Sequence, residues 1–387
     1  MTYLGGAAWL AAPGFRDDLL AELSIVPDTK RYAQAMKNAA LPPAEAMGAA
    51  VKRALKGAPA PGETAIVGDL VYREGPAPTA YWHQNALAKP FVATFSTIRE
   101  ASDILRSIQR NWAHYPVAAF RRAELIRERL PYVNDKPKKF PWSVPTAPMG
   151  MWSLLDERTL FASAETSSPF PAGRANFEED HENPPSRAYL KLYEALTWAD
   201  YLSRKAREGA KGPDGATATP KDAQAGFAPD RPGSGPHGAG NPNGTVRSVL
   251  PGPGSTCVDA GACPGGWTWV LDLLGANVTA IDRSELAPGL MAKPNIRFLK
   301  HDAFTLKPED FGPTDWVCSD VICYPPRLLE WVEKWLESGL AKNFICTIKM
   351  QGEADHETTR RFAAIPGSAI VHLGANKHEL TWIKLGQ

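Results

Sequence analysis

Four ionisable residues stand where an α/β chain could present reactive groups, namely Lys191, Asp320, Lys349 and Glu379. Lys191 lies in an amphipathic run, Asp320 and Lys349 end apolar stretches, and Glu379 opens one. In open α/β sheets, groups at the carboxyl ends of strands border the ligand crevice. Each residue alone is more simply explained as a solvated charge. Two lysines beside two carboxylates could nevertheless remove a proton from a weakly acidic group.

A Gly/Pro-rich turn precedes these residues at 257–267, with the sequence Cys-Val-Asp-Ala-Gly-Ala-Cys-Pro-Gly-Gly-Trp. The pattern predicts a strand, a tight turn and a helix start, and the glycines allow close approach of the backbone to a ligand. Pro264 lacks the amide hydrogen that a pyrophosphate cradle uses, and bulky Trp267 follows. The turn therefore favours a nucleoside without phosphates, such as S-adenosylmethionine. The simpler alternative is a tight turn of any α/β domain.

Three expected strands each end in an acid, at Asp259, Asp282 and Asp302. Asp282 follows Asp259 by about 20 residues, the spacing at which an acid meets ribose hydroxyls in nucleotide-binding folds. Parallel strands bring their carboxyl ends to one edge of a sheet. We therefore expect the three acids to converge on one crevice, which weakens the simpler explanation of the turn.

The composition is that of an ordinary globular protein, with 44% hydrophobic and 22% charged residues among 387, enough for two or three domains. We expect no signal peptide and no membrane span, because the start lacks a basic segment and no apolar run approaches 18 residues. The five cysteines lie mostly in apolar strands, which favours reduced thiols and a cytoplasmic protein. The histidines do not cluster, so we expect no metal site.

Residues 1–180 mix expected helices and strands, which predicts an α+β region of one or two small modules. The expected helices are 15–23, 101–112 and 118–130, and the expected strands are 64–72, 91–97 and 152–162. Residues 101–150 hold nine Lys/Arg against four Asp/Glu. A local basic excess can form a backbone-binding face for RNA, although a solvated helix surface is the alternative. The candidate RNA-binding residues are Arg121, Arg122, Arg127, Arg129, Lys136, Lys138 and Lys139.

The segment 205–254 is rich in Gly, Pro, Ala and Ser, and predicts a flexible insertion within the second domain, 181–387. From residue 256 onward, strands and helices alternate. That order predicts a mostly parallel, doubly wound sheet. The last two strands, 369–374 and 379–385, are joined by a short loop, so we expect one of them to be antiparallel.

The chain resembles the FtsJ/RrmJ-type RNA 2′-O-ribose methyltransferases. Over about 186–387 it carries, in order, Ser-Arg-Ala-x-x-Lys-Leu, the Asp-x-Gly-x-x-Pro-Gly-Gly-Trp turn, a Ser-Asp pair, a strand-end lysine and a late glutamate. The resemblance implies a Rossmann-like class I S-adenosylmethionine-dependent methyltransferase domain with a seven-stranded sheet. It also implies a catalytic tetrad at Lys191, Asp320, Lys349 and Glu379.

Within this family the chain is similar to the RlmM-like rRNA methyltransferases, which carry a THUMP domain. The similarity rests on 262–268, on Ser-Pro-Phe at 168–170 and on Pro-Gly-Phe at 13–15. It implies a THUMP-like RNA-binding region before the methyltransferase domain. It also implies methyl transfer to a ribose 2′-hydroxyl, with large-subunit ribosomal RNA as the partner, and we expect a monomer.

A ribose hydroxyl is a poor nucleophile and needs a general base. We assign Lys349 as that base, Lys191 as the group that lowers its pKa, Asp320 as its positioning partner, and Glu379 as a residue that orients Lys191 or the ribose. Since neighbours in a strand point to opposite faces, His378 should lie away from the crevice. The predicted cofactor-binding residues are Asp259, Gly261, Cys263, Pro264, Gly265, Gly266, Trp267, Asp282, Asp302 and Asp320.

Two other functions stay open. A base-directed methyltransferase would carry an Asn/Asp-Pro-Pro-aromatic run or a Pro-Cys nucleophile, whereas Asp320 is followed by Val-Ile-Cys-Tyr-Pro-Pro. A non-catalytic RNA-binding protein would not need all four polar positions. Binding of S-adenosylmethionine separates the second alternative from the enzymes, and the position of the transferred methyl group separates ribose from base chemistry.

Overall fold

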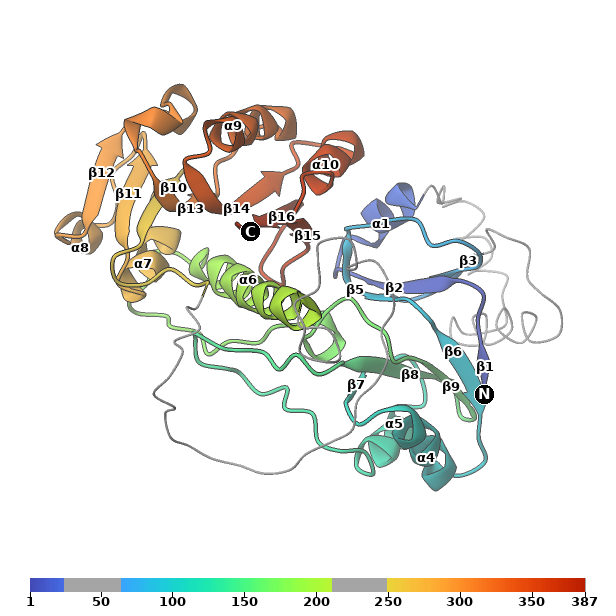
Figure 1. The fold of residues 1–387 in the computed structure, drawn as a ribbon. Helices are drawn as coiled ribbons and strands as arrows, with labels where there is room; N and C mark the ends of the chain where they lie inside the picture. The colour runs from blue at the N-terminus through green and yellow to red at the C-terminus, as the bar shows by residue number, and fades with distance from the viewer. Residues whose placement is uncertain (24–63, 211–248, 387) are drawn as a thin grey trace.

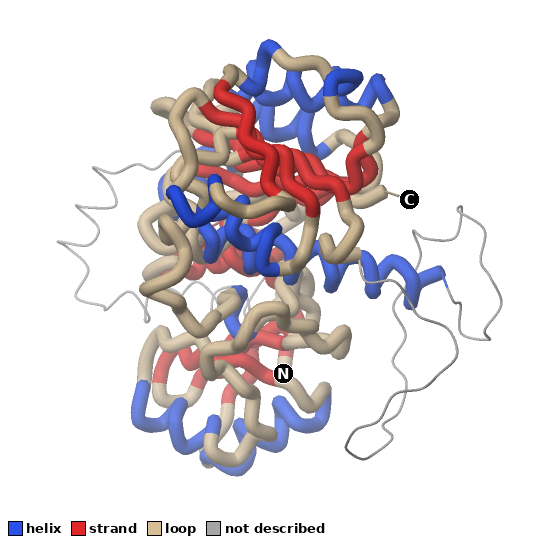
Figure 2. Tube along the Cα trace, turned by 90° about the vertical axis from the view of Figure 1, so that its left-hand side faces the viewer, coloured by secondary structure: helices blue, strands red, loops and turns tan. Residues whose placement is uncertain are grey.

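The computed structural model describes residues 1–23, 64–210 and 249–386. These residues form three β-sheets, two from the N-terminal region and one from the C-terminal half (Figure 1). The long helix α6 (Tyr189–Ala210) lies between the C-terminal sheet and one of the N-terminal sheets, as Figures 1 and 2 both show.

The C-terminal sheet has seven strands in the order β12-β11-β10-β13-β14-β16-β15. Its strands are β10 (Thr256–Ala260), β11 (Asn277–Asp282), β12 (Ile296–Lys300), β13 (Thr314–Ser319), β14 (Ala341–Lys349), β15 (Ser368–Val371) and β16 (Glu379–Lys384). Only β16 runs against its neighbours β14 and β15. The predicted Rossmann-like sheet and its one antiparallel strand are confirmed. The strand order reverses between β10 and β13, which is the switch point where such sheets bind ligands.

Helices cover both faces of this sheet, as the unbroken apolar runs of its strands predict. The helices after α6 are α7 (Gly266–Leu273), α8 (Pro288–Met291), α9 (Pro325–Ser338) and α10 (His356–Ala363), with short 3₁₀ turns η2 (Ala303–Thr305) and η3 (Pro308–Asp310). Successive strand residues point to opposite faces. Val317 thus joins the core beneath α9, whereas its neighbour Cys318 joins the core beneath α6 and α7.

The first N-terminal sheet has the order β3-β4-β2-β5. Its elements are β2 (Ala7–Ala11), α1 (Arg16–Glu22), β3 (Thr64–Val67), β4 (Leu70–Arg73) and β5 (His83–Leu87). The prediction of one strand over 64–72 was wrong, because the segment is a hairpin. Gly68 has φ +57°, a left-handed conformation that glycine adopts without strain and that turns the chain back on itself.

The second N-terminal sheet has the order β1-β6-β9-β8-β7. Its elements are β1 (Thr2–Tyr3), β6 (Phe91–Thr94), α4 (Ile98–Ile108), β7 (Trp112–His114), α5 (Phe120–Arg127), β8 (Gly150–Asp156), β9 (Thr159–Ser163) and the 3₁₀ turn η1 (Pro171–Gly173).

Three boundaries in this second sheet differ from the predictions. The expected strand 152–162 is a hairpin, because the Asp156 carboxylate accepts hydrogen bonds from Arg158 N and Thr159 Oγ1 and so stabilises a turn. Trp112 opens a strand instead of ending a helix. The strand from Phe91 ends at Thr94, since Thr97 caps the N-terminus of α4.

Part of the segment predicted to be a flexible insertion is helical. Helix α6 continues through Ala210, so the prediction that the insertion starts at 205 was wrong. The i,i+4 ion pair between Arg204 and Asp200 (2.9 Å) supports this last part of the helix. Residues 211–248 lie outside the described part of the chain. The domain boundary at 180 and the THUMP-like nature of the N-terminal region stay predictions.

Candidate active site

The four ionisable residues singled out from the sequence meet in one closed ring. Lys191 Nζ lies 2.7 Å from both carboxylate oxygens of Asp320 and 3.1 Å from Glu379 Oε1. Lys349 Nζ lies 2.7 Å from Asp320 Oδ1 and 2.8 Å from Glu379 Oε2. Each lysine thus contacts both carboxylates, and each carboxylate contacts both lysines. The formal charge of the ring is zero.

The sheet topology explains how residues so far apart in sequence come together. Lys349 is the last residue of β14 and Glu379 the first of β16, and antiparallel pairing places the two directly opposite. Asp320 follows β13, the parallel neighbour of β14, so its side chain emerges at the same edge. Lys191 comes from the first turn of α6. The ring therefore stands at the carboxyl edge of the parallel strands, where the fold binds ligands.

Burial and pairing set the charge states of the ring. Burial acts to lower the pKa of Lys349, but Asp320 and Glu379 outweigh it and hold that pKa above its ordinary value. Burial acts to raise the pKa of Asp320, but Lys191 and Lys349 outweigh it and lower that pKa. The prediction that Lys349 has a lowered pKa was therefore wrong for the closed ring, in which Lys349 contacts both carboxylates. Sequence reasoning weighed the second lysine but did not place both carboxylates against Lys349.

His378 lies on the other side of β16 from the ring, as the strand alternation predicted. Its Nε2 is 3.1 Å from Asp18 Oδ1, and its ring stacks at 5.8 Å on Phe15. Trp82 of the N-terminal sheet also contacts it, with ring centroids 5.1 Å apart. His378 thus helps join the N-terminal region to the seven-stranded sheet, a role that sequence reasoning missed because the partners are about 300 or more residues away.

The Gly/Pro-rich turn uses its own amides internally. Gly261 N and Ala262 N both donate to Ile281 O, at 2.9 and 3.1 Å. Cys263 N donates to Asp282 Oδ2 at 3.0 Å, and Pro264 has no amide hydrogen. The amides of 261–263 are therefore satisfied by the protein, so they are not available to a phosphate group. This agrees with the expectation of a nucleoside without phosphates.

The glycines of the turn serve packing as well as close approach. A Cβ on Gly261 would lie 2.6 Å from Val321 Cγ2, and one on Gly265 would lie 2.3 Å from Leu290 Cδ1. Gly265 also has φ +116°, which other residues rarely adopt. A Cβ on Gly266 would lie 2.5 Å from Ser186 Oγ. At these points the turn packs against protein side chains. The glycines are therefore needed because a Cβ would clash with those side chains.

Trp267 is a packing residue in this structure. It is 3% exposed, and its Nε1 donates to Ala188 O at 3.0 Å. The indole therefore anchors the start of α7 to the segment that carries Lys191. Its predicted contact with a cofactor is not supported by this placement, because the ring faces the core beneath α6 and α7.

Asp259 is completely buried at the end of β10. Its Oδ2 accepts a hydrogen bond from Thr268 Oγ1 at 2.6 Å, whereas its Oδ1 has no hydrogen-bond partner within the described residues. Burial raises its pKa to about 7, although the Thr268 hydrogen bond opposes the shift. A buried acceptor without a partner is costly unless a ligand satisfies it. Thr268 was missed in the sequence, where a helical threonine nine residues after the acid carries no distinct signal.

The two other strand-end acids, Asp282 and Asp302, differ in how many of their acceptor sites are used by protein groups. Asp282 accepts one backbone N–H on each oxygen, from Cys263 and from Ser284, which leaves acceptor sites open. Asp302 is more engaged, because Arg283 and Arg327 lie 2.5 and 3.5 Å from its Oδ2. The structure thus supports Asp282 as a ligand of the cofactor better than it supports Asp302.

The predicted RNA-binding residues fall into two groups. Arg122, Arg127 and Lys138 interact with their own surroundings; for example, Arg122 donates to Ser96 O and Arg127 to Glu124. The side chains of Arg121, Arg129, Lys136 and Lys139 are exposed and form no hydrogen bond or ion pair with other described residues. These four are the better candidates for contacts with phosphates.

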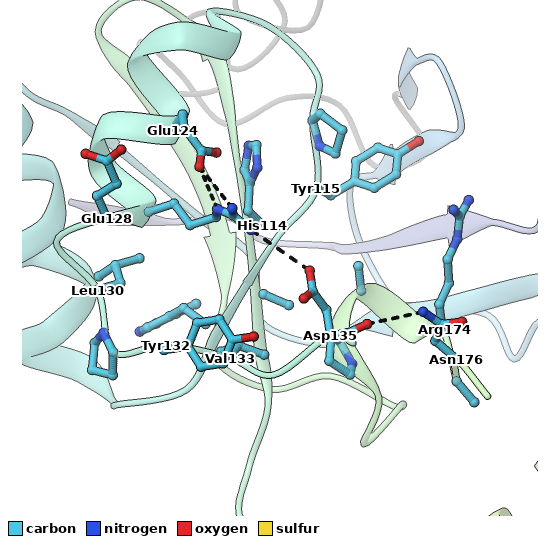
Figure 3. A pocket seen from close by; sticks show the side chains of 18 residues that line it. His114, Tyr115, Glu124, Glu128, Leu130, Tyr132, Val133, Asp135, Arg174 and Asn176 are labelled. Carbon is cyan, nitrogen blue, oxygen red and sulfur yellow. Dashed lines mark hydrogen bonds and ion pairs between the residues drawn. The ribbon is translucent and has the colours of Figure 1, made fainter. Parts of the chain in front are cut away.

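A cavity of about 960 Å³ lies in the N-terminal region between β7, α5 and the chain around η1 (Figure 3). Glu124, Glu128 and Asp135 line it together with Arg127 and Arg174. His114 also faces it, and burial lowers the pKa of that histidine to about 4. Its mixed charge distinguishes the cavity from a plain anion site, and it lies apart from the ring of four.

Comparison with known proteins finds a family match for the second half of the chain. Residues 245–373 match the family model of FtsJ-like methyltransferases. The curated relatives include the "Ribosomal RNA large subunit methyltransferase M" of Halorhodospira halophila, 38% identical over 128 residues, or 33% of this chain and 36% of that protein. The protein of that name from Xanthomonas oryzae pv. oryzae is 27% identical over 264 residues, 67% of this chain and 59% of that protein.

The chain thus spans only part of the length of the curated relatives that it matches. Solved structures give weaker likenesses. A ribosomal RNA methyltransferase from Plasmodium falciparum has a TM-score of 0.27 at 15% identity, covering 36% of this chain and 89% of that one. Aeropyrum pernix fibrillarin with bound S-adenosyl-L-methionine has a TM-score of 0.26 at 18% identity, with coverages of 35% and 68%. These scores are too low to carry an argument.

The family match and the geometry concern the same part of the molecule. Asp259, Asp282, Asp302, Asp320 and Lys349 all lie within the matched residues, and the sheet that carries them is the predicted mostly parallel, seven-stranded one. Lys191 and Glu379 lie outside the matched residues and are brought to the site by α6 and β16. Residues 245–373 are therefore similar to FtsJ-like methyltransferases, both in sequence and in where they hold these acids and Lys349.

Proposed function

We propose that this protein transfers a methyl group from S-adenosylmethionine to a ribose 2′-hydroxyl of RNA. The observation that carries the proposal is the closed ring of two lysines and two carboxylates at the switch-point edge of the sheet. Methyl transfer needs an oriented nucleophile and a group that takes its proton. The ring offers charged donors and acceptors that could hold a hydroxyl and receive its proton.

The residues beside the ring fit S-adenosylmethionine, which supplies an electrophilic methyl group on a cationic sulfur. The turn has no free amides at 261–263 for a phosphate, and this ligand has none. Asp282 retains acceptor sites for ribose hydroxyls. Asp259 is completely buried, so we propose that it supports the turn from beneath. The predicted participation of Asp302 requires that Arg283, which is 75% exposed, share or release the carboxylate.

In the proposed reaction Lys349 accepts the proton of the 2′-hydroxyl in its uncharged form. The two carboxylates hold Lys349 protonated at rest, so the uncharged form is a minor species at neutral pH. Asp320 and Glu379 keep the ammonium in place, and Lys191 balances their charge while it donates a hydrogen bond. When the ribose enters, it displaces part of this network, and the loss of a carboxylate contact makes release of the lysine proton easier.

The N-terminal region would bind the RNA, mainly by phosphate contacts from Arg121, Arg129, Lys136 and Lys139. The names of the curated relatives support large-subunit ribosomal RNA as the substrate. We also propose a cytoplasmic location, which the five free cysteines support. No described helix is long and apolar enough to cross a membrane.

The test is to map the methyl group. The purified protein is incubated with methyl-labelled S-adenosylmethionine and unmodified ribosomal RNA, and the RNA is digested to nucleosides. We expect the label in a 2′-O-methyl nucleoside, with transfer about 10²- to 10⁴-fold slower in a Lys349→Ala control. Label in a base would favour the base-directed alternative, and cofactor binding without transfer would favour a non-catalytic RNA-binding protein.

A further inference from the structure

Two large apolar side chains stand in solvent directly beside the ring of four. Ile322 is 77% exposed and Tyr324 is 67% exposed. Val321, which precedes Ile322, and Cys323, which lies between the two, pack against the core beneath α9. This alternation is that of an extended segment, in which residues two apart share a face. Ile322 and Tyr324 therefore form one outward surface, which we name the apolar shelf.

The backbone beneath the apolar shelf is held at both ends. Asp320 N donates to Ala260 O at 3.2 Å, and Val321 fills the space beside Gly261, where a Cβ would come within 2.6 Å of it. Tyr324 is the N-cap of α9 and its carbonyl accepts from Arg327 N at 3.0 Å. The backbone that carries the shelf is thus fixed at both ends. Ile322 and Tyr324 are exposed because their side chains point away from the core.

The position of the shelf indicates what covers it. Ile322 and Tyr324 are two and four residues after Asp320, whose carboxylate binds both lysines of the ring. An extended chain rises about 3.3 Å per residue, so the shelf begins about 7 Å along the chain from the proposed reaction centre. A molecule larger than one ribose that binds at the ring could therefore contact the shelf.

The charges around the shelf favour nucleic acid as that molecule. The ring itself carries no formal net charge. Arg327, one helical turn after Tyr324, is 53% exposed, and Arg283 is 75% exposed; both point toward Asp302 at the same edge of the sheet. The two arginines share one carboxylate there, and both are exposed enough to donate hydrogen bonds to a phosphate as well. An apolar surface with an adjacent positive charge matches a nucleotide, which has a flat base and an anionic backbone.

We propose that the apolar shelf stacks an unpaired base of the RNA and thereby selects single-stranded or splayed nucleotides for methylation. Tyr324 supplies the aromatic face and Ile322 packs at its side. This inference rests on the proposed function, and it adds the substrate class: a base inside a continuous duplex stack cannot offer its face to Tyr324. The preference would be for strandedness more than for base identity, since every base has a π-face.

The first experiment measures stacking without methyl transfer. A short single-stranded RNA with a 2-aminopurine base is titrated with wild-type protein, with Tyr324→Ala and with Tyr324→Phe. Stacking on the aromatic ring quenches 2-aminopurine fluorescence. We expect quenching with wild type and Tyr324→Phe, little with Tyr324→Ala, and little with any variant when the RNA is annealed to its complement. Equal quenching by wild type and Tyr324→Ala would overturn the proposal.

The second experiment measures the effect on catalysis. Base stacking on an aromatic side chain contributes about 1–3 kcal/mol, so Tyr324→Ala should raise the RNA KM roughly 5- to 150-fold, with S-adenosylmethionine affinity unchanged. Leu273→Ala is the matched control, because Leu273 is 53% exposed and ends α7, at the opposite edge of the sheet. An unchanged KM in Tyr324→Ala contradicts the shelf while ribose methylation stands.

Failure of the proposed function gives a different pattern. In that case wild-type protein would quench 2-aminopurine in a Tyr324-dependent manner but would transfer no methyl group to ribose. If the shelf instead docks a protein, Tyr324→Ala would bind and methylate free RNA like wild type and would lose activity only on ribosomal particles. The same wild-type and Tyr324 variants therefore distinguish a failure of the proposed function from docking of a protein on the shelf.

Discussion

The two halves of this molecule handle charge in opposite ways. At the ring of four, Lys191 and Lys349 are enclosed by Asp320 and Glu379, and no side chain of the ring is more than 16% exposed. We use the name N-terminal basic face for the exposed side chains of Arg121, Arg129, Lys136 and Lys139. Beside it, Arg127 is paired with Glu124, and the two side chains are 51% and 50% exposed. Buried pairs are little screened by salt, whereas exposed charges are strongly screened.

This difference separates two tasks. Charges that are buried against each other keep a defined geometry, because releasing any one of them leaves an uncompensated charge. Such a cluster suits a reaction that depends on orientation. Exposed charges lose little when they move, so they suit adaptable contacts with a polyanion. We expect changes at the ring to affect rate, and changes at the basic face to affect affinity and its salt dependence.

Removal of Lys349 should have the largest effect. Lys349→Ala removes the proposed base, and loss of a general base typically lowers the rate about 10²- to 10⁴-fold. Methyl transfer is measured in single turnover, and S-adenosylmethionine binding and thermal unfolding show whether the domain stays folded. His378→Ala is the control on the other side of β16. Wild-type activity in Lys349→Ala, with activity lost in His378→Ala, would reverse the assignment.

Removal of Asp282 should affect the cofactor more than the rate. Asp282→Ala loses charge-assisted hydrogen bonds, on the order of 1.5–3 kcal/mol, or roughly a 10- to 150-fold weaker affinity for S-adenosylmethionine. Isothermal titration measures the affinity, with Asp103→Ala on α4 as a control that removes an exposed carboxylate elsewhere. Equal affinities for Asp282→Ala and wild type would count against this ligand role.

The pH dependence of the rate tests the protonation state of the ring. Asp320 and Glu379 raise the pKa of Lys349, so neutral solution lies below that pKa. In this range each increase of one pH unit makes the uncharged form about tenfold more abundant. The single-turnover rate should therefore climb about tenfold per pH unit from neutral into mildly alkaline solution. A rate that is flat over this range would mean that Lys349 acts as a charged hydrogen-bond donor.

The smallest effect is expected at the basic face. Arg121→Ala with Arg129→Ala should weaken RNA binding several-fold and lower the steepness of its salt dependence by about two phosphate contacts. The control is Lys334→Ala on α9, an exposed lysine paired with Glu330 in the other half of the molecule. An unchanged salt dependence in the double variant would place RNA binding elsewhere, such as the cavity between β7 and α5.

Local patterns in the sequence were enough to predict much of the second half of the chain. Apolar runs that end in Asp259, Asp282 and Lys349 predicted β10, β11 and β14, because strands buried on both faces are continuously apolar. The N-terminal region was less predictable. Its hairpin at 156–159 is turned by the side chain of Asp156, and neither glycine nor proline signals it.

The sequence by itself determined which residues are candidates, since the motif positions and the alternation of strand residues are local properties. It placed Glu379 and His378 on opposite faces of β16 correctly. Only the tertiary structure decided that Lys349 sits between two carboxylates, and hence the direction of its pKa, because a pKa depends on distances across α6, β13, β14 and β16. Likewise, the two arginines that engage Asp302 come from separate segments that meet only when the sheet and α9 pack together.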